Sequence, residues 1–381
     1  MKIRRGTPDD YHQVTERADL AFCAKNPVHV NFEQLRPDTI RRDEASMAQW
    51  LLAEVDGEIA AGIHIVPRSI QLTAGTCLNV SGLADVFTYP PFRGQGLMSA
   101  LLKETIRALE SEGCAMNVLG GDRLRYANYG WDLAGTDRQL FLEPSALRFD
   151  KEKLTSSDLR RCAPGDRTTI ERMHAMYNRR LPRAQRTCEE FERTLLRSGV
   201  HFWINDTDEG FAYAAVRGNQ IMEFAGDKAA IDRIFRFLVG LKPHTVFIPP
   251  PAFSEDIDNM LLRFAGHYSV FPGRMIRIIR LLETVKPYMP ILEKRLTGWQ
   301  GKRSLLIEDN NDSVTISKEG DNIELGPGPD SAGAADICVN RCDAARLLFG
   351  PFFPESESLQ HDPFVRSVFP LPFHMSGLYK V

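Results

Sequence analysis

The sequence lacks the patterns that would assign it to several common classes of protein. It has no C-x-x-C pair and no H-E-x-x-H, and its seven cysteines are scattered, so neither a structural metal nor a disulfide framework is expected. Its apolar runs are too short to span a membrane, and residues 1–5 lead into a strand pattern rather than a signal peptide. These absences predict a cytoplasmic protein without a metal ion or a membrane partner.

An excess of positive charge is also missing. The 47 basic and 50 acidic residues give a formal net charge of −3, which provides no basic surface for nucleic acid. The apolar content of 43% and the charged content of 25% are those of an ordinary soluble globular protein. A chain of 381 residues is too long for one hydrophobic core, so two or three domains are expected.

The strongest functional signal lies in residues 89–98. An apolar, strand-like run at 83–88 precedes them, and a helical pattern of apolar residues follows. A strand, a turn with Gly94 and Gly96, and a helix N-terminus make an anion site, because free N–H groups and the positive end of the helix dipole point to one place. Arg93 adds a charge suited to phosphate. This stretch predicts a loop that holds a pyrophosphate.

Other glycine-loop motifs do not fit this stretch. The P-loop pattern, Gly-x4-Gly-Lys-Ser/Thr, occurs nowhere in the chain. A dinucleotide fingerprint needs a third glycine where Ser99 stands, and Arg93 is not part of that pattern. An ordinary strand-to-helix turn with two glycines is the remaining alternative, but the arginine, the strand and the amphipathic helix agree on an anion site.

The loop resembles the Arg-x-x-Gly-x-(Gly/Ala) signature of the GCN5-related N-acetyltransferases. Met98 departs from the small residue usual at the sixth position, and a bulky residue there resembles the Eis-like branch (enhanced intracellular survival proteins), with tandem acetyltransferase domains and a C-terminal sterol-carrier-like domain. The resemblance implies acetyl-CoA as co-substrate. Its pantetheine arm would pair with the backbone of Val86, Phe87 and Thr88. Its pyrophosphate would be bound by Arg93, Gly94, Gln95, Gly96, Leu97, Met98 and Ser99.

Residues 120–131 follow an expected strand at 115–119 and resemble the family segment Tyr-x-x-(aromatic)-Gly-(aromatic), which borders the thioester. The resemblance implies that Gly121 and Asp122 lie near the co-substrate and that Tyr126 is the general acid. An amine that attacks a thioester expels a thiolate, and a nearby phenol can hydrogen-bond to that sulfur and protonate it. Simple packing is the alternative role for this tyrosine.

The order of predicted elements also resembles the acetyltransferase fold. Strands are expected at 3–5, 49–55 and 58–66, with a hairpin at 69–88, and two helical stretches fill the interval to about residue 47. His64 lies within one of these strands, where a structural role is favoured over a catalytic one.

A second copy of this pattern begins about 156 residues later, where Arg161 to Asp166 echoes Arg5 to Asp10. A hairpin-like pattern follows in both copies, which suggests a duplicated domain over about 155–285. After residues 221–224 the second copy reads Ala-Gly-Asp-Lys, without an Arg-x-x-Gly loop, so it is not expected to bind coenzyme A. A chance likeness of two turns is the alternative.

The C-terminal region has a different pattern. Residues 303–326 alternate apolar and polar, a further strand is expected at 335–339, and a short helix at 342–348. This small α+β unit resembles the sterol-carrier-like module. The predicted fold class is therefore α+β with mixed sheets: an acetyl-CoA-binding domain at 1–150, a degenerate acetyltransferase-like domain at 151–290 and a sterol-carrier-like domain at 291–381.

The last residues, 364–381, are apolar and aromatic, so they are expected to pack against the rest of the chain. In the Eis-like family the terminal α-carboxylate acts as general base in the first domain, and that role would fall to Val381. An α-carboxyl of pKa near ~3.5 is a poor base for an ammonium near ~10.4, so it would need desolvation or a bridging water. Packing alone is the alternative.

The resemblance implies an N-acetyltransferase whose acceptor is a primary amine: an aminoglycoside-like amine, a polyamine or a lysine side chain. Direct attack in a ternary complex is expected, because no cysteine or serine nucleophile stands beside a base. Family members form hexamers, which suggests a homo-oligomer. Two alternatives are a non-catalytic acyl-CoA sensor or scaffold and a transferase for longer acyl chains. Four acidic residues are candidates for a cationic pocket or for simple solvation: Asp19, Glu33, Asp85 and Asp122.

Overall fold

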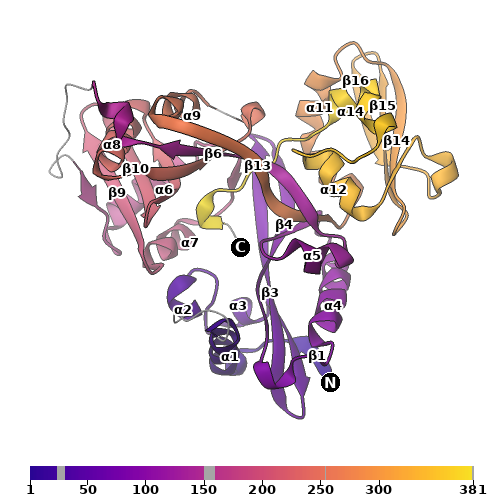
Figure 1. Cartoon of the computed structure of the whole chain (residues 1–381), viewed down its shortest axis with the longest axis horizontal. Coiled ribbons are helices and arrows are strands. Elements are labelled where there is room, and N and C mark those ends of the chain that lie inside the picture. The colour runs from indigo at the N-terminus through magenta and orange to yellow at the C-terminus, as the bar shows by residue number, and fades with distance from the viewer. Residues whose placement is uncertain (24–30, 150–158, 254, 380–381) are drawn as a thin grey trace.

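The computed structural model describes residues 1–23, 31–149, 159–253 and 255–379. Figure 1 shows three parts: a first half with β3 and α4, a second half with β10 and α8, and a C-terminal unit with β14 and α12. A 13-stranded sheet runs through both halves in the order β1-β2-β3-β4-β5-β13-β6-β12-β11-β10-β9-β7, with β8 paired to β3. The C-terminal unit has its own sheet, β16-β15-β14-β17.

The first half has the expected alternation of strands and helices, with three helices where two helical stretches were expected before about residue 47. It comprises β1 (Lys2–Arg5), α1 (Tyr11–Cys23), α2 (Phe32–Leu35), α3 (Glu44–Met47), β2 (Trp50–Val55), β3 (Glu58–Thr73), β4 (Thr76–Thr88), α4 (Leu97–Ser111), β5 (Met116–Leu119), α5 (Arg123–Tyr126) and β6 (Asp132–Leu142). Helix α4 buries residues three or four apart, including Leu97, Leu101 and Leu109, so one apolar face packs on the sheet.

The extent of the strand that begins at residue 58 also differs from the expectation. The sequence suggested a strand at 58–66 and a separate hairpin from 69, whereas β3 continues through Pro67 to Thr73. The pairing of β3 with β2 ends at His64. Pro67 lies beyond that point, so its missing N–H removes no hydrogen bond to β2.

The second half repeats the order of the first. It comprises β7 (Arg160–Arg161), α6 (Arg167–Tyr177), β8 (Arg183–Ala184), α7 (Cys188–Arg193), β9 (Val200–Thr207), β10 (Gly210–Arg217), β11 (Gln220–Gly226), α8 (Lys228–Leu241), β12 (His244–Ile248), α9 (Asp256–Leu261) and β13 (Ala265–Ile278). In each half one helix connects two parallel strands, α4 between β4 and β5 and α8 between β11 and β12.

The two halves exchange their last strands. Strand β13 of the second half lies between β5 and β6, whereas β6 of the first half pairs with β12 on its other edge. Each half therefore completes its sheet with a strand from the other. The sheet is continuous across the middle of the molecule, and the expected domain boundaries stay predictions.

The C-terminal unit packs beside the first half. It comprises α10 (Leu281–Val285), α11 (Met289–Arg295), β14 (Gly301–Ile307), β15 (Asp312–Glu319), β16 (Asn322–Pro327), β17 (Ile337–Val339), α12 (Arg341–Phe349), α13 (Glu357–His361) and α14 (Pro363–Val368). Helix α12 contacts β6 and β13, and Figure 1 shows it on the side of the unit that faces them. The likeness of this unit to a sterol-carrier module stays a prediction.

The chain after α14 returns to the large sheet, as expected from its apolar character. From Leu371 to Tyr379 every side chain except that of Ser376 is buried. His374 Nδ1 lies 3.0 Å from Asp137 Oδ1 on β6, and Ser376 Oγ donates to Glu223 Oε2 on β11 at 3.1 Å. Figure 1 shows this yellow segment between the two halves. The tail is therefore part of the core between them.

Candidate active site

The site begins where β4 and β5 separate. Their parallel ladder ends at the pair Leu83–Leu119, whereas β4 continues to Thr88. At Asp85 the backbone has φ of +49°, and the register with β3 shifts there, as in a β-bulge. Beyond Leu83, in the described part of the chain, the edge of β4 that faces β5 has no strand partner. Its backbone groups can therefore pair with an extended ligand.

The glycine loop forms the first of two cavities at this edge. Gly94 and Gly96 have φ of +82° and +75°, and a Cβ on either would meet no atom within 4 Å, so the loop borders open space. Gly96 begins α4 without a side-chain cap, which leaves the first N–H groups of the helix free for an anion. The residues that line this loop cavity, of about 450 Å³, are Ala21, Phe22, Val86, Phe87, Thr88, Phe92, Arg93, Gly94, Gln95, Gly96, Leu97, Met98, Ser99 and Arg125.

Two side chains hold the loop in place. The guanidinium of Arg93 donates to the backbone oxygens of Ala21 at 3.2 Å and Thr88 at 3.4 Å, so its charge lies along the side of the loop cavity. Tyr129 donates from its hydroxyl to Ser99 Oγ in the first turn of α4, at 2.7 Å. The second bond joins the loop to the segment that carries Tyr126.

The second cavity, called the cleft cavity here, has a volume of about 600 Å³ and lies between the two halves of the sheet. It shares Phe22, Val86 and Arg125 with the loop cavity, so the two spaces are contiguous at the edge of β4. Its lining residues are Phe22, Phe32, Leu35, Arg36, Leu83, Ala84, Asp85, Val86, Gly120, Gly121, Asp122, Arg125, Tyr126, Arg197, Arg217, Gln220, Met222 and Gly377.

Tyr126 lines the cleft cavity, at the end of α5. Asp122 caps this short helix by accepting from the N–H of Leu124 at 3.0 Å. The ring of Tyr126 lies edge-on to Trp131, whose Nε1 donates to Asn117 Oδ1 on β5 at 2.8 Å. Burial raises the pKa of Tyr126, so its hydroxyl keeps its proton at neutral pH.

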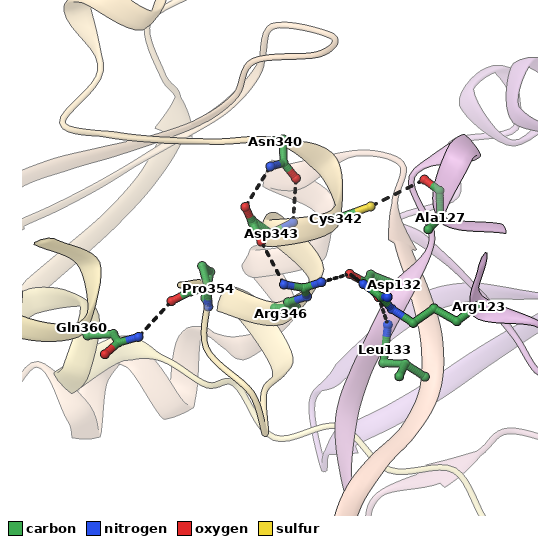
Figure 2. A network of polar contacts seen from close by, with 10 residues as sticks. All are labelled: Arg123, Ala127, Asp132, Leu133, Asn340, Cys342, Asp343, Arg346, Pro354 and Gln360. Atoms are coloured by element: carbon green, nitrogen blue, oxygen red, sulfur yellow. Dashed lines mark hydrogen bonds and ion pairs between the residues drawn. The ribbon is translucent and has the colours of Figure 1, made fainter. Parts of the chain in front are cut away.

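A polar network fixes the base of α5 to the C-terminal unit (Figure 2). Arg123 donates from Nη2 to Asp132 Oδ2 at 3.0 Å, and Arg346 of α12 donates to the same carboxylate. Cys342, also on α12, lies with its sulfur 3.6 Å from the backbone oxygen of Ala127. Helix α12 of the C-terminal unit therefore stabilises the position of the segment that carries Tyr126.

Asp85 forms the floor of the cleft cavity. His64 Nδ1 lies 3.1 Å from Asp85 Oδ2, and the imidazole stacks on Trp50 with ring centroids 4.6 Å apart. Burial lowers the pKa of His64, so the imidazole is neutral. Burial raises the pKa of Asp85, but Arg36, 3.8 Å away, and the bond to His64 outweigh it, and this pKa is lowered overall. An ionised carboxylate only accepts, so the proton is on Nδ1.

The second half and the tail supply the opposite wall. Arg197 is held by a two-point ion pair with Asp38, with Nε 2.7 Å from Oδ1, and by the backbone oxygen of Leu378 at 2.6 Å. Arg217, at the end of β10, is exposed and pairs in the ladder with Gln220. The cavity is therefore completed by elements far from the glycine loop in sequence.

The equivalent connection in the second half is closed. Asp227 stands at the start of α8, where its Oδ2 accepts from the N–H of Phe211 at 3.0 Å. A Cβ on Gly226 would lie 2.4 Å from Cα of Ala212, so β10 fills the space that is open in the first half. The negative charge of Asp227 beside the start of α8 also disfavours an anion there.

The structure places the sequence-predicted residues in two contiguous groups. Ten of them line the loop cavity: Val86, Phe87, Thr88, Arg93, Gly94, Gln95, Gly96, Leu97, Met98 and Ser99. Gly121, Asp122 and Tyr126 line the cleft cavity, and Val86 lines both. Val381 lies outside the described residues.

Sequence analysis missed the four arginines of the cleft cavity. Arg36, Arg125, Arg197 and Arg217 come from different elements and belong to no motif that was used. Arg125 lies inside the segment 120–131, but its spacing carried no signal. Only the packing of the two halves brings these side chains together.

Comparisons with known proteins find similarity to acetyltransferases. Residues 2–134 match the family described as acetyltransferase (GNAT) domain. A conserved protein from Enterococcus faecalis V583, described as a probable N-acyltransferase, superposes with a TM-score of 0.67 and 16% identity over 91% of this chain and 89% of its own. A search of curated proteins gives no match.

Two further solved structures share the fold. A GCN5-related N-acetyltransferase from Anabaena variabilis ATCC 29413 gives a TM-score of 0.64 and 16% identity over 94% of this chain and 92% of its own. Eis1 from Mycobacterium abscessus gives 0.57 and 12% over 92% and 90%. At these identities the likeness concerns the fold, which agrees with the mixed α+β class expected from the sequence.

Two further structural features are absent from the described residues. No helix among them is long and apolar enough to cross a membrane. Nor do they contain a group of three His, Cys, Asp or Glu side chains placed to hold a metal ion. The glycine loop, the separated strands and the family match agree: residues 2–134 match a GNAT acetyltransferase domain and have its fold.

Proposed function

We propose that this enzyme transfers an acetyl group from acetyl-CoA to a primary amine by direct attack within a ternary complex. The observation that carries the proposal is the continuity of the loop cavity and the cleft cavity at Val86, with Tyr126 among the residues that line the cleft cavity. One cavity suits a phosphate-bearing donor and the other a separate acceptor. The two substrates would meet at the edge of β4.

The donor would bind along the first half of the sheet. Its pyrophosphate would accept from the free N–H groups of α4 and its glycine loop, with Arg93 at the side. Its pantetheine amides would pair with the unpartnered edge of β4 at Val86 and Thr88. This alignment would bring the thioester to Tyr126.

The reaction needs two proton movements. The amine lone pair attacks the thioester carbonyl carbon, the C–S bond breaks, and the departing sulfur takes a proton from the Tyr126 hydroxyl. The new N–C bond leaves an extra proton on nitrogen, which must go to a base. The raised pKa of Tyr126 supports its role as the acid, because the phenol is protonated when the sulfur leaves.

The base remains the α-carboxylate of Val381, proposed from the family resemblance. The tail that leads to it supports this role at one point, since Gly377 lines the cleft cavity. Asp85 suits a different task. Its lowered pKa makes it a weak proton acceptor but a good anchor for the ammonium form of the acceptor.

The test is thiol release from acetyl-CoA over a panel of primary amines, with donor binding measured separately by calorimetry. Turnover that depends on the amine supports the proposal. Tight donor binding without turnover of any amine would contradict it and favour an acyl-CoA sensor. A parallel series with acetyl-, propionyl- and palmitoyl-CoA tests the acyl group, and preference for the longest chain would favour a long-chain transferase.

A further inference from the structure

The charges around the cleft cavity are unevenly distributed. Four arginines line it, Arg36, Arg125, Arg197 and Arg217, against two aspartates, Asp85 and Asp122. Of the two arginines contributed by the second half, Arg197 is paired with Asp38, whereas Arg217 has no acidic side chain beside it among the described residues. The acceptor would therefore meet the unpaired positive charge of Arg217 on the wall formed by the second half.

The carboxylates near the cavity are already engaged. Asp85 is bonded to His64 and lies beside Arg36, and Asp122 accepts the capping bond from α5. Asp38 does not line the cavity, and both of its carboxylate oxygens accept hydrogen bonds from Arg197. An acceptor with several ammonium groups would place additional positive charges beside arginines, and the nearby carboxylates are already paired. This arrangement is electrostatically unfavourable.

Arg217, unlike these carboxylates, has no charged partner among the described residues. It forms no ion pair within the described part of the chain, and the stem of its side chain passes over Gly199, with Cγ 4.0 Å from the position of a Cβ there. Gln220, its partner in the β10–β11 ladder, lines the same cavity and adds an amide donor. A guanidinium and an amide side by side suit a carboxylate or a phosphate.

The two walls of the cleft cavity therefore favour ligand groups of opposite charge. The first half contributes the ionised Asp85 and Tyr126 to the lining of the cavity, where the amine would react. The second half presents Arg217 and Gln220 across a cavity of about 600 Å³, a size that suits a small molecule. A molecule with an ammonium group at one end and an anionic group at the other would satisfy both walls.

We propose that the natural acceptor is a primary amine that also carries an anionic group, a carboxylate or a phosphate, and that Arg217 binds this group. The inference rests on the proposed acetyl transfer and narrows its acceptor. It disfavours the polyamines and aminoglycoside-like amines expected from the family resemblance. The anionic end would bind the second half while the amine approaches β4.

The experiment uses pairs of acceptors that differ in one anionic group. Lysine is compared with cadaverine, which lacks only the carboxylate, and glucosamine 6-phosphate with glucosamine, so that the two pairs separate carboxylate from phosphate recognition. We expect kcat/KM to favour an anionic member by roughly tenfold or more, the range of one charge-assisted hydrogen bond. Arg217→Gln should remove most of that preference, mainly by raising KM.

Two controls keep the test specific. Arg366→Gln changes an exposed arginine on α14, outside both cavities, and should leave the preference intact. Arg217→Glu should favour cadaverine over lysine. Equal or better turnover of the uncharged or cationic member by the native enzyme would overturn the inference and leave acetyl transfer standing. Loss of both members equally in Arg217→Gln would also overturn it, whereas no turnover of any amine would overturn the proposed function itself.

Discussion

Arg346 of α12 donates to Asp132 of β6 across the boundary between the C-terminal unit and the large sheet (Figure 2). The Asp132 side chain is completely buried, whereas Arg123, its second partner, belongs to the helix that carries Tyr126. Burial raises the pKa of Asp132, but the bonds from Arg123, the N–H of Leu133 and Arg346 lower it overall, so the group is ionised at neutral pH. This carboxylate links the C-terminal unit to the helix that carries Tyr126.

Asp132→Asn should destabilise the protein by about 3 kcal/mol, because two guanidinium groups would lose their shared buried counter-charge. Chemical denaturation at pH 7 measures the loss. Asp321→Asn, at an exposed position in the β15–β16 turn, is the matched control and should change stability by less than about 0.5 kcal/mol. A loss no larger than that of the control would contradict the assigned role.

The buried His64 should make stability depend on pH. Its pKa is lowered by burial, so below about pH 6.5 the unfolded state binds a proton that the folded imidazole resists. The free energy of unfolding should therefore fall as the pH drops from 7 to 5, by at most about 1.4 kcal/mol per pH unit from this group. His64→Gln should flatten that slope.

The same unfolding experiments on His361→Gln provide the comparison. His361 is exposed on α13, so its removal should leave the slope unchanged. Equal slopes in the native protein and in His64→Gln would show that the pH dependence comes from other groups.

Tyr126→Phe should lower kcat by about 10²-fold and leave the KM for acetyl-CoA unchanged, because only the proton donated to the leaving sulfur is lost. Burial raises the pKa of Tyr126, so the native enzyme should keep its activity to higher pH than an ordinary phenol would allow. Steady-state rates from pH 6 to 10 test both points. Tyr268→Phe, at a tyrosine that is 61% exposed, should behave like the native enzyme.

Gly96→Val should raise the KM for acetyl-CoA by at least about tenfold. The substitution forces a branched side chain into φ of +75° and places its atoms in the open space of the loop cavity. Gly165→Val is a matched control, since Gly165 has φ of +87° and equally open surroundings in the second half. Both variants should lose similar stability, and only the first should lose donor affinity; equal donor affinity would argue against the loop as the pyrophosphate site.

Extension of the chain beyond Val381 by three glycines should abolish turnover while acetyl-CoA binding persists, if its α-carboxylate is the base. The extension moves the carboxylate by several residues but leaves the buried segment from Leu371 to Tyr379 unchanged. The same three residues at the N-terminus are the control. Undiminished turnover of the C-terminal variant would remove Val381 from the mechanism and leave the transferase intact.

Local patterns predicted the strand, the glycine loop and the helix that line the loop cavity, whereas their role in donor binding stays a prediction. The strand at 83–88, the glycines at 94 and 96 and the apolar face of α4 are neighbours in sequence, so their spacing reports their geometry directly. The same holds for Tyr126, which is only seven residues beyond the end of β5.

The acceptor side could not be predicted in this way. Arg36, Arg197 and Arg217 lie on a loop, a turn and a strand end that look like solvated surface when read alone. They line one cavity because β6 and β13 are exchanged between the halves and because the tail packs between them. Contacts between residues separated by a hundred positions or more leave no periodic signal in a single sequence.

The sequence by itself therefore determined the fold class, through its order of strands and helices, and the local geometry of the glycine loop, whose residues are neighbours in the chain. Tertiary structure alone decided which charged residues line the cleft cavity, the pairing of His64 with Asp85 and the anchoring of α5 by Arg346. Those features arise from the burial and meeting of charged groups from distant segments, and their energies are set by the partners that folding brings within reach.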